Sequence, residues 1–211
     1  MSTITALQTG KRNDKKVNLF IDGKFAFSVE KDAAVKEGLK VGGQLSGERL
    51  EMLMETLQES RCLDAAYRYL SYRARSEAEL KERLIKRGFP LPHVERALEK
   101  LHEQGLVNDS EFATFWAENR ARFSPRSHAM MRSELRHKGV SPEVIHDAVA
   151  TIDEPEAAYT AAHSRLRRLQ GLEYPVFRQR LGEFLKRRGF GYEIINQTIK
   201  KIWQEINSKK E

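Results

Sequence analysis

Arginine and lysine gather in two segments of this 211-residue sequence, and their chemistry is the recognition of anions. The first segment contributes Arg120, Arg122, Arg126, Arg132, Arg136 and Lys138. The second contributes Arg165, Arg167, Arg168, Arg178, Arg180, Lys186, Arg187 and Arg188. A guanidinium group presents a planar fork of donors that fits either a carboxylate or a phosphate. We therefore predict a surface that contacts acidic groups of a protein or the phosphates of a nucleic acid.

The largest excess of positive charge lies near the C-terminus, and a smaller excess of +3 lies in residues 61–108. Residues 154–211 carry 12 basic and 7 acidic side chains, a net charge of +5 out of +7 for the whole chain. A single basic side chain in the last turn of a helix is explained by the helix dipole and needs no ligand. Eight of them within residues 165–188 favour contact with phosphates, through Coulomb attraction and counterion release rather than base readout.

Residues that could carry catalysis are few. The chain contains no Walker A motif, no glycine-rich dinucleotide loop, no His-Glu-x-x-His motif and no Gly-x-Ser-x-Gly elbow. Cys62 is the single cysteine, which excludes an internal disulfide and any multi-cysteine metal site, and we expect a buried structural thiol. The six histidines show no ligand spacing and are His93, His102, His128, His137, His146 and His163. We predict no enzyme activity, no metal and no cofactor.

Two further features concern location and packing. The N-terminal segment lacks a basic region followed by an apolar run, and no stretch approaches 18 consecutive apolar residues. We therefore expect a cytoplasmic protein that does not insert into a membrane. Trp116 and Trp203 lie within apolar helical patterns, so we expect them to pack in the core rather than stack on nucleobases.

The elements that position these side chains recur three times. Gly88, Gly139 and Gly189 lie 51 and 50 residues apart, and each follows a pair of basic side chains. The positions eight and four residues before each glycine, and six, ten and thirteen residues after it, are apolar in all three copies. These positions are Leu80, Met131, Leu181, Leu84, Leu135, Leu185, Val94, Ile145, Ile195, Leu98, Val149, Ile199, Leu101, Ile152 and Ile202. The spacing predicts two helices separated by a glycine at the C′ position of the first.

An upstream helical pattern precedes each pair, so we predict three tandem three-helix repeats and nine helices. Their predicted boundaries are 61–108, 109–153 and 154–211. Glu134 is expected to pair within the fold, while Arg132 and Arg136 project outward from the helix that buries Met131 and Leu135.

Residues 1–60 form a different, smaller extension. The stretch VNLFIDGKFAFSV alternates around Asp22-Gly23, which predicts a β-hairpin of residues 17–21 and 25–29 with a type I′ turn. Residues 4–8 could add a third strand, and short helices are expected at residues 31–37 and after Gly47.

Local capping signals fix several helix boundaries. Asp109 is a predicted N-cap, and Ser76 with Glu79 has the spacing of a capping box. Ser141 stands before Pro142, a residue suited to the first turn of a helix.

Three segments of the repeats resemble one known family. ELKERLIKRGF, GLVNDSEFATFW and SPRSHAMMRSELRHKGV are similar to signature segments of the RecX family, the bacterial regulators of the RecA recombinase. The likeness covers roughly residues 61–206 and is most specific between Asn108 and Gly139, whereas the third repeat departs from the pattern in LRRLQGLEYPVF. It implies a mainly α fold of three three-helix repeats in an elongated, curved array that lies in the groove of a RecA nucleoprotein filament.

The resemblance also implies a function in homologous recombination, DNA repair and the SOS response. The protein would be a monomer that binds the RecA filament and modulates it, mainly by inhibiting strand exchange and ATP hydrolysis, with weaker contact to single- or double-stranded DNA. The predicted contact residues are Arg122, Arg126, Arg132, Arg136, Lys138, Arg165, Arg167, Arg168, Arg178, Lys186, Arg187 and Arg188. The alternatives are a sequence-independent nucleic-acid-binding protein and a helical-repeat scaffold for another partner.

Overall fold

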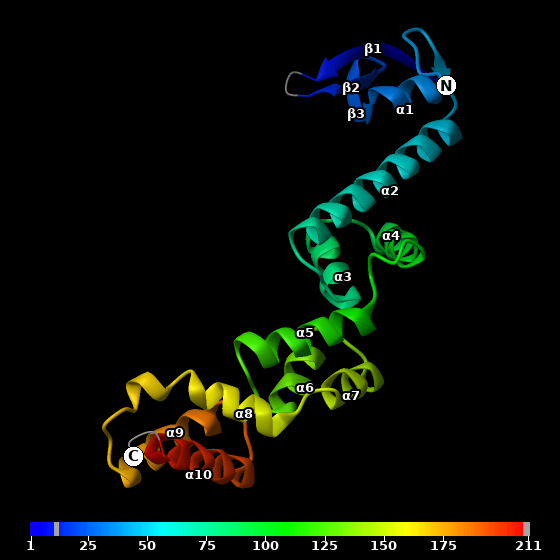
Figure 1. Cartoon of the computed structure of the whole chain (residues 1–211). Coiled ribbons are helices and arrows are strands. Elements are labelled where there is room, and N and C mark those ends of the chain that lie inside the picture. The colour runs from blue at the N-terminus through cyan, green and yellow to red at the C-terminus, as the bar shows by residue number, and fades with distance from the viewer. Residues whose placement is uncertain (11–12, 209–211) are drawn as a thin grey trace. The chain divides into compact units, whose positions relative to one another are not determined.

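The computed structural model describes residues 1–10 and 13–208, which form ten α-helices, one 3₁₀ turn and four β-strands. Figure 1 shows the order of these elements along the chain. They divide into two compact units, one of residues 1–68 with 84–97 and one of residues 69–83 with 98 onward. The fold is mainly α, as predicted, with a small N-terminal region of strands.

The N-terminal region is an antiparallel sheet in the order β3-β2-β1-β4. Its strands are β1 (Ser2–Gly10), β2 (Asn13–Ile21), β3 (Lys24–Glu30) and β4 (Gln44–Leu45). Asp22 and Gly23 have φ angles of 48° and 79°, as a type I′ turn requires. The predicted hairpin and third strand are thus confirmed. Strand β4 was not predicted, because two residues are too few to show an alternating pattern.

Helix α1 (Lys31–Lys36) agrees with the prediction, whereas helix α2 (Gly47–Tyr72) differs from it. Two separate helices were expected on either side of residue 60. The structure has one helix of 26 residues, because neither glycine nor proline interrupts the chain between Gly47 and Tyr72. Leu53 of α2 is buried with the apolar face of the sheet, while Met54 is 47% exposed.

Eight further helices complete the three repeats within the described residues. They are α3 (Glu77–Lys86), α4 (Leu91–Glu103), α5 (Asp109–Phe123), α6 (His128–His137), α7 (Pro142–Ala150), α8 (Glu154–His163), α9 (Tyr174–Arg187) and α10 (Tyr192–Ser208). The 3₁₀ turn η1 (Leu166–Arg168) lies between α8 and α9. Together with α2, this gives the predicted nine helices, three in each repeat. Among the described residues, no helix combines the length and apolar character needed to cross a membrane.

The aligned glycines end α3, α6 and α9 as predicted. Gly88, Gly139 and Gly189 have φ angles of 93°, 76° and 85°. Each glycine amide bonds to a carbonyl oxygen three residues earlier at 2.9 Å, and the next amide bonds to the oxygen of the buried leucine four residues before the glycine. This pair of bonds is the Schellman motif, whose left-handed C′ residue is normally glycine.

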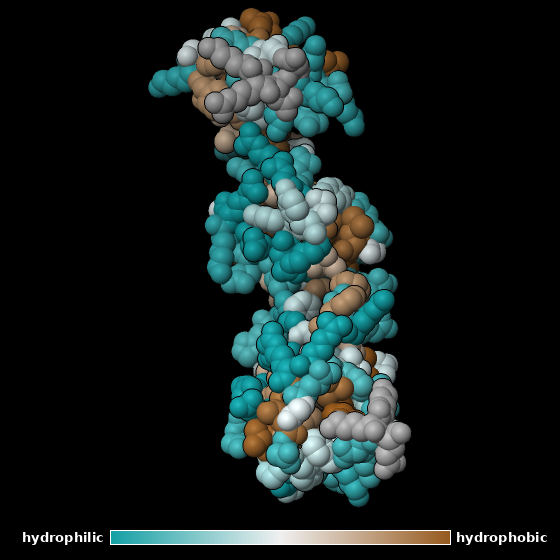
Figure 2. Space-filling model, turned by 60° about the vertical axis from the view of Figure 1, so that its left-hand side comes forward, coloured by the Kyte–Doolittle hydropathy of each residue, from teal (hydrophilic) through white to brown (hydrophobic). Residues whose placement is uncertain are grey.

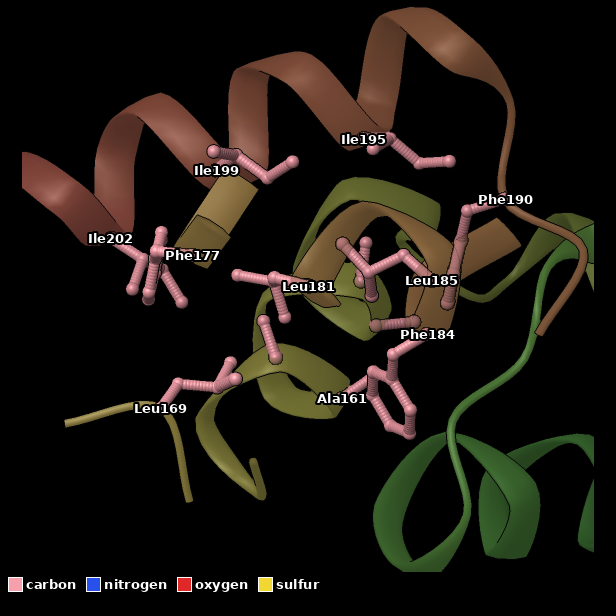
Figure 3. Packing of buried hydrophobic residues seen from close by; sticks show 13 residues of the cluster. Ala161, Leu169, Phe177, Leu181, Phe184, Leu185, Phe190, Ile195, Ile199 and Ile202 are labelled. Carbon is pink, nitrogen blue, oxygen red and sulfur yellow. The ribbon is translucent and has the colours of Figure 1, made fainter. Parts of the chain in front are cut away.

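The aligned apolar positions form the cores of the repeats. Fourteen of the fifteen are buried, and Ile152 is partly buried between the clusters of the second and third repeats. Figure 3 shows the third repeat, where Leu181 and Leu185 of α9 meet Ile195, Ile199 and Ile202 of α10. Hydrophilic side chains dominate the face drawn in Figure 2.

Cys62 and the tryptophans also follow the predictions. Cys62 is buried in α2, and burial raises the pKa of its thiol to about 11, which suppresses the reactive thiolate. Trp203 packs against the core of the third repeat, with its ring centroid 5.0 Å from that of Phe177. Trp116 is partly buried against the core of the second repeat.

Candidate functional site

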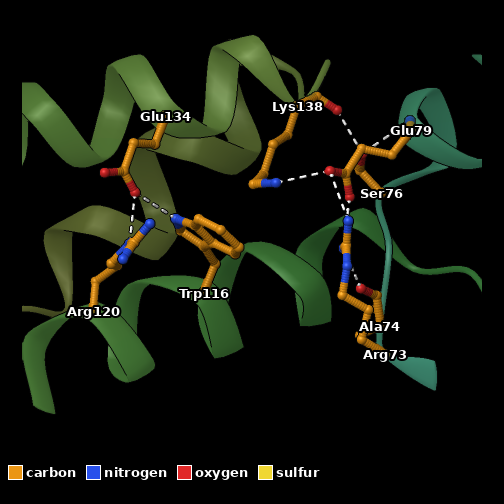
Figure 4. A network of polar contacts seen from close by, with 8 residues as sticks. All are labelled: Arg73, Ala74, Ser76, Glu79, Trp116, Arg120, Glu134 and Lys138. Atoms are coloured by element: carbon orange, nitrogen blue, oxygen red, sulfur yellow. Dashed lines mark hydrogen bonds and ion pairs between the residues drawn. The ribbon is translucent and has the colours of Figure 1, made fainter. Parts of the chain in front are cut away.

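The N-terminus of α3 is joined to the second repeat by backbone and side-chain hydrogen bonds, and we call this contact the first joint (Figure 4). The hydroxyl of Ser76 donates to the carbonyl oxygen of Lys138 and accepts from the amide of Glu79 at 3.2 Å. Asp109 accepts from the amide of Glu77 at 2.8 Å. Asp109 was predicted to cap its own helix, and this was wrong: Asn108 is the N-cap of α5, while Asp109 caps α3.

Two cations hold the carboxylate of Glu79 at this joint. Arg73 lies 2.9 Å from one oxygen, and the ammonium of Lys138 lies 2.8 Å from the other. Burial opposes ionisation, but the hydrogen bonds from Arg73 and Lys138 outweigh it and lower the pKa of Glu79 to about 2. Lys138 also lies 4.1 Å from the centroid of the Trp116 ring, so its charge has two partners within the fold.

Glu134 neutralises two arginines of the same repeat. Arg120 reaches one carboxylate oxygen at 2.8 Å, and Arg126 reaches the other at 2.7 Å. The indole of Trp116 donates to Glu134 at 2.9 Å. The prediction that Glu134 pairs within the fold is confirmed.

A second joint of the same design links α6 to the third repeat. Ser127 and His128 follow Ser76 and Glu77 by 51 residues. The amide of Ser127 donates to the carbonyl oxygen of Arg188 at 3.0 Å, and the amide of His128 donates to Glu154 at 3.1 Å. Arg188 returns a hydrogen bond to the carbonyl oxygen of Pro125 at 2.8 Å. The repeats are therefore connected by a repeated polar contact as well as by apolar packing.

These joints give two of the aligned glycines a second role. A Cβ atom at Gly139 would overlap the Cβ of Ala78, and one at Gly189 would lie 2.5 Å from the Ser127 hydroxyl. A Cβ at Gly88 would meet no atom within 4 Å. The sequence predicts these helix ends but not the close approach of Gly139 to Ala78 or of Gly189 to Ser127, because the residues of each pair are far apart in the chain.

The third repeat contains a hollow of about 270 Å³ that we call the arginine cleft. Its lining residues are Arg165, Arg168, Leu169, Arg180, Glu183, Phe184 and Arg187. Arg165 precedes the turn η1 as its N-cap, and Arg168 is the last residue of the turn. Helix α9 supplies Arg180 and Arg187, which lie on one face because they are seven residues apart. Among the described residues, no carboxylate forms an ion pair with these four arginines.

Aromatic stacking orients two guanidinium groups beside the cleft. Arg165 lies 4.6 Å and Arg188 lies 4.7 Å from the centroid of the buried Phe184 ring. Burial lowers the pKa of Arg188, and the like charges of Arg126 and Arg165 lower it further. Burial makes the larger contribution to this shift, and the smaller part reflects repulsion among neighbouring guanidinium groups.

The structure divides the predicted contact residues into groups. Arg126, Lys138 and Arg188 are partly buried and bonded inside the fold. Arg165, Arg168 and Arg187 line the arginine cleft, whereas Arg178 and Lys186 line a different hollow between α9 and α10. The exposed residues outside both hollows are Arg122, which stacks on Phe123, and Arg132, Arg136 and Arg167.

The arginine cleft also contains two residues that the sequence did not predict to be there. Arg180 joins the cleft, although it was not among the predicted contact residues. Phe184 was missed as well, because its pattern signals only a core residue. The i, i+7 spacing of Arg180 and Arg187 was the one available signal.

Comparison with known proteins agrees with this architecture along almost the whole chain. The model of the RecX regulatory protein N-terminal domain matches residues 2–46. Models of the first, second and third three-helix domains of RecX match residues 62–101, 108–149 and 152–199. Regulatory protein RecX of Bacillus licheniformis is 30% identical over 202 residues, which are 94% of this chain and 77% of the relative.

The chain belongs to the RecX family. Regulatory protein RecX of Clostridium botulinum is 29% identical over 95% of this chain and 96% of its own. A crystal structure of regulatory protein RecX has a TM-score of 0.66 at 23% identity, over 94% of this chain and 98% of that one. RecX from Lactobacillus salivarius gives a TM-score of 0.60, also at 23% identity, over 69% of this chain and 97% of its own. These solved structures share the fold of the chain described here.

Proposed function

We propose that this RecX-family chain is a cytoplasmic, monomeric, non-enzymatic regulator that binds the RecA nucleoprotein filament and inhibits its recombinase and ATPase activities. The observation that carries the proposal is the family match, in which relatives named regulatory proteins align over 94–95% of the chain.

The distribution of charge supports a docking function. Three tandem repeats offer several exposed cations, among them Arg132 and Arg136 on α6 and the arginine cleft on the third repeat. A filament presents the same binding surface many times, so several weak contacts sum through their high effective concentration. A molecule bound in this way would oppose the exchange of RecA protomers or their turnover of ATP.

The test is a titration of the full-length protein against RecA on single-stranded DNA, with ATP hydrolysis as the readout. The expected result is a decrease in the hydrolysis rate that saturates with the added protein. Unchanged hydrolysis at saturating protein would refute the proposal. Bovine serum albumin at the same concentrations controls for dilution and crowding.

A second candidate function is sequence-independent nucleic-acid binding. The arginine cleft favours it, because four guanidinium groups that form no ion pair among the described residues suit phosphates and provide no readout of base sequence. A simple DNA binder would show a steep decrease in affinity with salt and the same affinity for bare and RecA-coated strands. A preference for the coated strand supports the first proposal over this one.

A further inference from the structure

Gly182 occupies the interior of α9 without a structural reason to be glycine. Glycine in a helix interior is destabilising relative to alanine. Gly182 is not among the residues with positive φ, and a Cβ atom there would lie 3.6 Å from Ile199 and 3.8 Å from Ile195, both ordinary contacts. Neither the backbone conformation nor the packing against α10 therefore requires glycine at this position.

The other repeats show that this helical position accepts a long side chain. Seven residues before the C′ glycine, where the third repeat has Gly182, the first repeat has Lys81 and the second has Arg132. All three residues lie in the helix that ends at the aligned glycine. The absence of a side chain at Gly182 is thus specific to the third repeat.

Gly182 opens a hollow of about 440 Å³ between α9 and α10, which we call the tyrosine groove. Its apolar surface comes from the buried Ile195 and Ile199, which face α9 in Figure 3, and from two tyrosines at the surface. Tyr192 is 76% exposed, and Tyr174 is 40% exposed with its ring 5.1 Å from that of Trp203. A long side chain in place of Gly182 would fill this space.

The charges beside the groove suggest what occupies it. Arg178 and Lys186 stand four residues before and four residues after Gly182, so the two cations flank the opening about 6 Å to either side along α9. Glu183 is the one carboxylate among the lining residues. An apolar side chain with carboxylates on both sides is the complement of this arrangement.

We propose that the tyrosine groove docks a short peptide segment of a partner protein, with an apolar side chain above Gly182 and carboxylates paired with Arg178 and Lys186. A nucleic acid fits this groove less well, because its lining is mainly apolar while Arg180 and Arg187 of the same helix serve the arginine cleft. Peptide binding by the groove can be measured without RecA or DNA, so it is tested separately from the proposed function.

The probe is a panel of short fluorescein-labelled peptides, each with a central leucine or phenylalanine between aspartates or glutamates. Fluorescence anisotropy with the full chain measures their binding. Matched peptides carry serine in place of the apolar residue or lysine in place of the acidic residues. We expect the acidic, apolar peptides to bind at least about tenfold more tightly than either matched set. Equal binding of the serine peptides would mean that charge alone drives the contact and would overturn the proposal, as would no binding at all.

Variants of the groove separate docking from folding. Gly182→Leu should reduce peptide affinity at least about tenfold, while Gly182→Ala should raise the melting temperature by about 2–4 °C, because it removes a helix-interior glycine. Tyr192→Ala, at an exposed position, should weaken binding without a change in melting temperature, which keeps the test valid if Gly182→Leu folds poorly.

Charge reversal provides the matched control. Arg178→Glu with Lys186→Glu should reverse the preference from acidic to lysine-containing peptides, whereas Arg132→Glu with Arg136→Glu on the exposed face of α6 should not. The proposal is wrong if Gly182→Leu binds the acidic peptides like the parent. It is also wrong if an unlabelled oligodeoxynucleotide displaces them and loses that ability in the groove variants, because the occupant would then be a nucleic acid.

Discussion

In the second repeat, Arg120 and Arg126 both reach Glu134, and Lys138 reaches Glu79. In the third repeat, four arginines surround a hollow whose lining includes a single carboxylate. In the sequence, both regions appear as clusters of arginine. The two regions differ in one respect: carboxylates of the chain pair with the cations of the second repeat, whereas among the described residues none forms an ion pair with the arginines of the cleft.

The difference indicates which cations are available to a ligand. A guanidinium already bonded to a partly buried carboxylate must break that contact before it binds another anion, and losing one partner of such a pair is costly. Neighbouring guanidinium groups without carboxylates repel one another, and an arriving anion relieves that repulsion. We therefore propose that the cations of the second repeat's ion pairs serve stability and that those of the arginine cleft serve binding.

The largest expected loss of stability comes from a change at the first joint, where Lys138 pairs with Glu79. Gly139→Ala should lower the free energy of unfolding by about 2–4 kcal/mol, because it adds an overlap with Ala78 to the strain of a positive φ. Gly88→Ala, with a positive φ but open space, should lower it by only about 1 kcal/mol. Urea denaturation of both variants measures the difference. Equal losses would show that the joint does not constrain Gly139.

A smaller effect is expected when Glu79 loses its charge. Glu79→Gln should lower the free energy of unfolding by about 1–3 kcal/mol at pH 7, since Arg73 and Lys138 lose their shared counter-charge. The pKa of Glu79 in the folded protein is about 2, below its ordinary value of 4.5, so this stabilisation is present above pH 4.5 and disappears as the pH falls towards 2.

Urea denaturation at pH 7 and pH 3 checks both statements for Glu79. The gap between the parent and Glu79→Gln should narrow at the lower pH. Glu118→Gln, on the exposed surface of α5, is the matched control and should change stability little at either pH. A gap that widens on acidification would contradict the assignment.

The smallest effect tests the geometry of the arginine cleft rather than its charge. Arg168→Lys with Arg180→Lys keeps both charges but removes two planar forks. We expect the affinity for single-stranded DNA to fall about three- to tenfold at fixed salt, with an unchanged slope of log affinity against log salt. Affinity equal to that of the parent would show that the cleft acts through charge alone.

Much of the fold follows from local signals in the sequence. Leu84, Leu135 and Leu185 lie four residues before a glycine with positive φ, and this pattern depends only on helical geometry and on the conformational freedom of glycine. The N-terminal hairpin was predictable for the same reason, from Asp22-Gly23 between alternating apolar residues.

The parts that could not be predicted depend on residues distant in the chain. Asp109 caps α3 instead of its own helix, and Lys138 pairs with a carboxylate 59 residues away. No local pattern distinguishes Arg126, which is paired, from Arg168, which lines the cleft. The sequence therefore shows where the basic residues cluster, but it does not distinguish the members that pair within the fold from those that remain exposed.

The most direct test compares two double variants that each remove two positive charges. Arg168→Gln with Arg180→Gln changes the cleft, and Arg120→Gln with Arg126→Gln changes the ion pairs of the second repeat. Binding to RecA-coated single-stranded DNA and the urea midpoint are measured on the same preparations. The cleft variant should lose affinity at least about tenfold and keep its midpoint, while the second-repeat variant should lose about 1–3 kcal/mol of stability and keep its affinity. Equal losses of affinity in the two variants, or a loss only in the second-repeat variant, would contradict the account.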